Sequence, residues 1–207
     1  MQPAGYSVWS FNVILAVGVS MTIPPSSERP ILERFLKAEA MALWAVRAAQ
    51  LRDVPANVLA FLKQHEADEE EHLKHFETLV GYQSWGREVL PTVPHQWPSL
   101  AVLLFGYEAL GLEFAKLLVG LRPHMQSIVD DEETHVTFFE HEIRKLLAGE
   151  GVEADQARIS AKAWWKKLPR TIERYLQDAT LDACRTEVAS AMQAAIQRRF
   201  TDAGLLK

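Results

Sequence analysis

The sequence predicts an all-α fold, an antiparallel four-helix bundle followed by two additional C-terminal helices. Three observations predict it. Apolar residues recur at helical spacing through most of the chain after residue 28. One stretch, 81–98, is so rich in glycine and proline that we interpret it as a long connection between helices. Nothing in the chain has the pattern of a β-strand, and two helix pairs joined by one long connection are typical of a bundle.

The bundle helices are expected over 28–52, 55–80, 99–119 and from the turn at 120–123 to 148. Pro55 and Pro123 each suit the first turn of a helix, where a missing N–H leaves no intrahelical bond unmade. Gly120 closes the third helix, and Gly149 and Gly151 end the fourth.

Two further helices are expected over 154–167 and 170–200. We divide them at Pro169, because the residue before a proline is biased away from the helical conformation. The sequence therefore predicts a four-helix bundle over 28–149, with 150–207 packed on it as part of the same domain.

Residues 1–27 are expected to be an N-terminal extension that is non-native or flexible. Its apolar run at 8–19 is shorter than the roughly 20 residues that span a bilayer. It also lacks the basic start and the cleavage site of a secretory signal. We interpret it as a translated upstream extension with Met21 as the native start, and a segment that docks on a lipid surface or a partner is the alternative.

The charge and cysteine content exclude several classes of function. The formal net charge of −5 gives no general attraction for nucleic acid, so we expect no nucleic-acid partner. The single cysteine, Cys184, excludes an intramolecular disulfide and a cysteine-rich metal site. A chain without disulfides fits a reducing compartment, and we expect the cytoplasm.

The pattern Asp-Glu-x-x-His occurs twice, at 68–72 and at 131–135. Residues three apart on a helix lie on one face, with Cβ atoms about 5 to 6 Å apart, so a Glu and a His at this spacing can bind one ion together. In both copies the glutamate interrupts an apolar stripe. A carboxylate in such a setting is strongly disfavoured unless it is paired, protonated or bound to a cation.

Glu39 and Glu108 interrupt apolar faces in the same way, on the first and third expected helices. Each half of the chain thus supplies one lone glutamate and one Glu-x-x-His pair. The candidate ligands, which are also the candidate catalytic residues, are Glu39, Glu69, His72, Glu108, Glu132 and His135. Six such ligands suit two metal ions. Carboxylate with imidazole suits iron, manganese or zinc, and a carboxylate-rich pair of octahedral sites favours iron or manganese over zinc.

This ligand pattern resembles that of the ferritin-like di-iron carboxylate proteins, which include rubrerythrin and di-iron hydroxylases, over residues 28–148. The resemblance implies a four-helix bundle that holds two iron ions, with manganese as the alternative. It also implies that Asp68 and Asp131 orient the histidine of the opposite motif. The four-cysteine site that usually accompanies rubrerythrin is missing from this chain.

One departure leaves the ligand on the third helix open. Glu39 and Glu69 are 30 positions apart, but Glu108 and Glu132 only 24. Glu113 is therefore a rival to Glu108, although its spacing to Lys116 is typical of an exposed ion pair, and we favour Glu108. The remaining histidines near the motifs do not match the spacing and are expected at the surface or the edge of the core: His65, His75 and His141.

The resemblance implies an O2-dependent oxidase or monooxygenase that acts on a small or lipidic organic substrate and receives electrons from a separate protein. The alternative is a ferritin- or rubrerythrin-like iron-binding protein or ferroxidase without an organic substrate. A third class, a metal-free helical interaction protein, leaves the lone glutamates on apolar faces unexplained. The sequence leaves a homodimer open.

Overall fold

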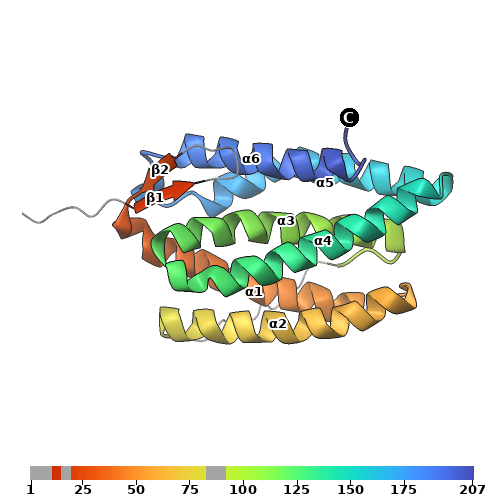
Figure 1. Ribbon diagram of the computed structural model, residues 1–207, viewed down its shortest axis with the longest axis horizontal. Helices are drawn as coiled ribbons and strands as arrows, with labels where there is room; N and C mark the ends of the chain where they lie inside the picture. Colours follow the sequence, from red (N-terminus) through yellow and green to blue (C-terminus); the bar gives the residue numbers. More distant parts are fainter. Residues whose placement is uncertain (1–10, 15–19, 83–91) are drawn as a thin grey trace, which may run out of the picture.

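The computed structural model describes residues 11–14, 20–82 and 92–207, and within them the chain is almost entirely helical, as predicted (Figure 1). The helices are α1 (Glu28–Ala49), α2 (Ala56–Val80), α3 (Trp97–Leu121), α4 (Gln126–Ala148), α5 (Val152–Tyr175) and α6 (Arg185–Asp202). The predicted connection between the second and third helices lies partly outside the described residues.

The first four helices form two antiparallel pairs. α1 packs along α2 and α3 along α4, because each pair is joined by a short turn that reverses the chain. The α2 helix ends at Gly81, which has a φ of 85° in the left-handed region that glycine adopts without strain. The pairs meet through contacts of α1 with α3 and of α2 with α4, which encloses one shared interior.

The α3 helix lies at the centre of the molecule (Figure 1). It contacts α1 and α4 on the bundle side and α5 and α6 on the other. Its sequence is apolar on nearly all sides, which is typical of a helix that is buried all round. The α3 helix lies close to α5 at Gly106, where an added Cβ would lie 2.3 Å from the Trp164 ring.

The division of the C-terminal helices is not where the sequence predicts it. The α5 helix runs through Pro169 and ends at Tyr175, and the break lies in the segment that contains the short 3-10 turn Ala179–Leu181. The prediction was wrong because one lost backbone bond at a proline is outweighed by packing: Leu168 and Ile172, on either side of Pro169, are both buried.

A short β-hairpin contradicts the prediction that the chain has no strand. β1 (Phe11–Ile14) and β2 (Ser20–Ile23) pair in antiparallel register, from Phe11 opposite Ile23 to Ile14 opposite Ser20. β1 lies against α3, and Ile23 of β2 is fully buried. Strands of four residues are too short for their alternation to show in a sequence. Of the predicted extension 1–27, residues 1–10 and 15–19 lie outside the described residues, and Pro25–Ser27 forms a short 3-10 turn before α1.

None of the helices in the described part of the chain combines the length and the apolar character needed to cross a membrane.

Candidate metal centre

The six candidate ligands come together in the interior between α1, α2, α3 and α4. Each has at most 3% of its surface exposed. Two groups of ligand atoms form, and within each group the atoms lie within 4.8 Å of one another. One group contains Glu39, Glu69, His72 and Glu132. The other contains His65, Glu69, Glu108 and His135. Since Glu69 belongs to both, the two groups adjoin.

The helical spacing of the two motifs positions these side chains. On α2, Glu69 lies on the same face as Leu62 and Phe76, and on α4 Glu132 lies on the face of Val136 and Phe139; all four apolar residues are fully buried. Burying the apolar stripe therefore carries the carboxylate and the imidazole of each motif into the interior. The sequence spacing puts the Glu and the His of each motif on this face, and the packing of the apolar residues around them keeps them in the interior.

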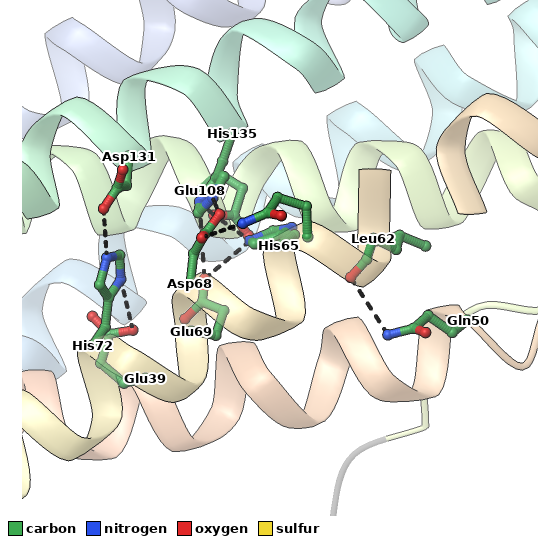
Figure 2. A network of polar contacts seen from close by, with 11 residues as sticks. Glu39, Gln50, Leu62, His65, Asp68, Glu69, His72, Glu108, Asp131 and His135 are labelled. Atoms are coloured by element: carbon green, nitrogen blue, oxygen red, sulfur yellow. Dashed lines mark hydrogen bonds and ion pairs between the residues drawn. The ribbon is translucent and has the colours of Figure 1, made fainter. Parts of the chain in front are cut away.

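The histidine of each Asp-Glu-x-x-His motif is hydrogen-bonded to the aspartate of the other motif, as the resemblance implies. His72 Nε2 is 3.1 Å from Asp131 Oδ2, and His135 Nε2 is 3.2 Å from Asp68 Oδ2 (Figure 2). When Nε2–H donates to the carboxylate, the lone pair of the imidazole resides on Nδ1. Both Nδ1 atoms face the glutamates: that of His135 is 3.5 Å from Glu108 Oε2, and that of His72 is 3.9 Å from Glu39 Oε2.

Burial governs the protonation of these carboxyl groups in the protein without metal. It raises the pKa of Glu39, Glu69 and Glu132 well above the usual value, and the charges of neighbouring glutamates raise these values further. Burial acts in the same direction on Glu108, but the adjacent imidazoles of His65 and His135 outweigh it, so the pKa of Glu108 is lowered. Four ionised carboxylates would concentrate more negative charge here than an apolar interior tolerates without cations.

Four polar atoms of the predicted ligands support a metal-binding role. They are buried and have no hydrogen-bond partner within the described part of the chain: Oε2 of Glu69 and Glu132, and Nδ1 of His72 and His135. Buried polar groups are normally satisfied, so each atom that is not requires an explanation. Carboxylate and imidazole together are suitable donors for divalent iron or manganese, and two such ions would balance the charge of four carboxylates. The residues present therefore fit a pair of metal ions.

The chain has no match in comparisons with protein-family models, with curated proteins and with solved structures.

The rival residues on α3 are placed differently. Glu108 faces the centre, whereas Glu113 lies outside both ligand groups and accepts a bond from Lys116 Nζ at 2.7 Å. The predicted ion pair is present, but its predicted exposure is wrong, because only 3% of Glu113 is exposed. Both C-terminal helices pack on α3, and the sequence alone did not indicate which side of it they would take.

His65 was missed as a residue of the centre. It was expected at the surface or the core edge, yet it is fully buried, with Nε2 at 3.0 Å from Glu69 Oε1 and 3.3 Å from Glu108 Oε2. A signal existed, because a residue four positions before Glu69 lies on the same helical face. The other two histidines, His75 and His141, are exposed, as expected.

A cavity of about 280 Å³ opens onto the carboxylates from the side of α1, α3 and α5. Its inner end is formed by the four glutamates of the centre, Glu39, Glu69, Glu108 and Glu132. Aromatic rings of Phe35, Phe114 and Tyr175 line its walls, and Arg174 contributes to the lining from α5. Among the described residues, the imidazoles of the centre do not line it. A molecule in the cavity would therefore meet the carboxylate side of the centre.

Proposed function

We propose that this chain is a ferritin-like di-iron oxidoreductase that uses O2 to oxidise a small, largely apolar organic molecule. The two ions, iron or alternatively manganese, would be held by Glu39, Glu69, His72, Glu108, Glu132 and His135. The observation that carries the proposal is the cavity, because it connects the carboxylate side of a buried two-ion site with a space of small-molecule size.

The protein side chains would have distinct roles. Glu69 would help to hold both ions, since it belongs to both ligand groups. The aspartates fix the orientation of the imidazoles, and the aromatic walls keep water away from the carboxylate side. The reduced metal pair would supply electrons to O2. One oxygen atom would enter the substrate and the other would leave as water, with two electrons and two protons supplied through a separate electron-donor protein.

The lining of the cavity favours an organic substrate over the alternative of an iron-handling protein. A path for iron ions is best lined by carboxylates along its length. Here the carboxylates are confined to the inner end, while Phe35, Phe114 and Tyr175 form the walls. A second cavity of about 280 Å³ between α3 and α5 shares Tyr107 and Thr171 with the first. The exposed guanidinium of Arg174 favours substrates that carry a carboxylate.

Metal binding is tested first. Metal-free protein is loaded with Fe(II) under argon, freed of excess ion and analysed for bound iron, and we expect two ions per chain. His72→Ala should lose metal and thermal stability together, because ion binding offsets the repulsion between the buried carboxylates. His75→Ala, which truncates an exposed ring on the same helix, should keep both ions. Less than one ion per wild-type chain would contradict the proposal.

Substrate oxidation is tested next. The Fe(II)-loaded protein is given ¹⁸O2, a chemical reductant and a panel of aromatic and medium-chain aliphatic carboxylic acids, and products are identified by mass spectrometry. An acid that gains one ¹⁸O atom supports a monooxygenase, and a dehydrogenated acid supports an oxidase. O2 uptake that ends when the bound iron is oxidised, without a product from any acid, would favour the ferroxidase-like alternative.

A further inference from the structure

We propose that His65 is a seventh protein ligand, so that the two ions differ in their nitrogen ligands. The ion held by Glu69, Glu108 and His135 would carry a second imidazole from His65. The ion held by Glu39, Glu69, His72 and Glu132 would carry only one. This inference rests on the proposed two-ion centre and goes beyond the six ligands that the sequence motifs predict.

The distances around His65 are those of neighbouring ligands. Atoms bound at about 2.1 Å to one ion lie ~3.0 Å apart in adjacent octahedral positions and ~3.4 Å apart in a tetrahedron. His65 Nε2 is 3.0 Å from Glu69 Oε1 and 3.3 Å from Glu108 Oε2, and His135 Nδ1 is 3.5 Å from the same Glu108 oxygen. Small movements would bring these atoms around a single ion.

The two imidazoles approach Glu108 side by side (Figure 2). The ring centroids of His65 and His135 are 3.8 Å apart, with an angle of 36° between the rings. Two protonated imidazoles at this distance in a buried site would repel each other strongly. A cation shared between Nε2 of one ring and Nδ1 of the other allows both rings to be neutral.

His65 differs from His72 and His135 in the partner of its second ring nitrogen, the one that faces away from the glutamates. His72 and His135 are each held by an aspartate, whereas Nδ1 of His65 has no hydrogen-bond partner within the described residues. Its ring instead packs against Phe61 and Phe139, with centroids 5.7 and 5.9 Å away. We therefore expect His65 to be the most easily detached of the three imidazoles.

The consequence is two ion sites of unequal affinity. Imidazole nitrogen raises affinity for ions late in the first transition series more than carboxylate oxygen does. The site that contains His65 and His135 should therefore bind Co(II) or Zn(II) first. The site next to His72 should fill second.

The test is a titration of the metal-free full chain with Co(II), followed by calorimetry and by visible absorption. Wild-type protein should bind two ions in two resolved steps. In His65→Gln the tighter step should weaken about tenfold or more, with a changed absorption spectrum, while the weaker step persists. The matched control is His75→Gln on the same helix, which should retain both wild-type steps.

A second measurement avoids the risk that His65→Gln fails to fold. In wild-type protein labelled with ¹⁵N-histidine, saturation with Zn(II) should shift the ring nitrogens of three of the seven histidines. Shifts confined to His72 and His135, or Co(II) binding by His65→Gln identical to wild type, would overturn the inference and leave the two-ion proposal standing. A wild-type chain that binds neither ion stoichiometrically would overturn both.

Discussion

At the scale of single residues, the centre depends on a close approach between α3 and α4. Gly111 lies opposite Glu132, and a Cβ at this position would be 2.9 Å from Glu132 Oε2. Contacts this short do not persist, so the carboxylate of Glu132 would have to move. The absence of a side chain at Gly111 therefore leaves the space that the carboxylate of a candidate ligand occupies, since the backbone of Gly111 is ordinary helix.

We predict that Gly111→Ala weakens metal binding without loss of the fold. Alanine favours a helix over glycine by about 1 kcal/mol, so a loss of affinity could not come from a weaker helix. Displacement of Glu132 should lower the affinity for at least one Co(II) ion by roughly tenfold, in the range observed for disturbed ligand shells. Co(II) titration together with circular dichroism measures this. Gly149→Ala is the control, because its added Cβ would make only ordinary contacts, and equal affinities in the two variants would contradict the prediction.

The residues that could be predicted from the sequence are those governed by local spacing. The Glu-x-x-His repeats identify side chains that share a face, and the bonds from His72 to Asp131 and from His135 to Asp68 match the expected pairing. His65, four positions before Glu69, shares its helical face and could have been predicted in the same way. The burial of Glu113 could not have been predicted, because α3 is packed on by helices from both sides, and no local pattern encodes where α5 and α6 pack.

At the scale of elements, the fit of α5 on α3 is fixed by one small residue and one large one. The missing side chain of Gly106 makes room for the Trp164 ring, which also stacks on Phe200 of α6 with centroids 4.9 Å apart. This contact joins three helices. It also sets the position of α5, from which Thr171, Arg174 and Tyr175 line the cavity at the candidate centre.

We predict that Gly106→Ala destabilises the protein by roughly 1–3 kcal/mol, the usual cost of overpacking a core. The double variant Gly106→Ala with Trp164→Leu should be less destabilised than the sum of the two single variants, because the smaller side chain relieves the clash. Unfolding in urea measures the free energies of this cycle. Strict additivity would show that the ring and the glycine do not act on each other.

Element boundaries were predictable where a strong signal lay close by. Gly81 ends α2 and Gly149 follows α4, as the sequence indicates. The break expected at Pro169 failed because α5 buries Leu168 and Ile172 on both sides of it, and this packing lies beyond what a single sequence shows. The β1–β2 pair was missed since Phe11–Ile14 belongs to an apolar run without visible alternation.

At the scale of the whole molecule, the buried carboxyl groups make stability depend on pH. The pKa values of Glu39, Glu69 and Glu132 are raised in the folded protein, chiefly by burial, above the value of 4.5 that applies when the chain is unfolded. Above that value the unfolded chain releases protons that the folded metal-free protein retains. The free energy of unfolding therefore falls as pH rises toward the raised folded values.

We predict that the urea midpoint of the metal-free protein is lower at pH 8 than at pH 7. Glu108 does not change this sign, because its lowered pKa affects stability only below 4.5. The lowered pKa values of His72 and His75 act in the opposite direction, but mainly below their ordinary value of 6.5, which lies outside this window. Glu132→Gln should flatten the dependence by removing one of the titrating groups. Saturation with Zn(II) should reverse the sign of the pH dependence, so that the urea midpoint rises with pH. The reason is that the ligands must lose their protons to bind a metal. A metal-free midpoint that rises between pH 7 and pH 8 would contradict the prediction.

The hydrogen bonds of His72 to Asp131 and of His135 to Asp68 run between α2 and α4. The imidazole in each half of the chain is therefore oriented by an aspartate from the other half. Removing the carboxylate of Asp68 would leave the hydrogen bond of the neighbouring His72 to Asp131 intact. It would instead remove the hydrogen bond of His135 on α4. A substitution in one helix pair therefore changes the orientation of a histidine in the other pair. A fragment cut after residue 82 would carry a histidine that it cannot orient, and mixing the two separated halves should restore what each lacks.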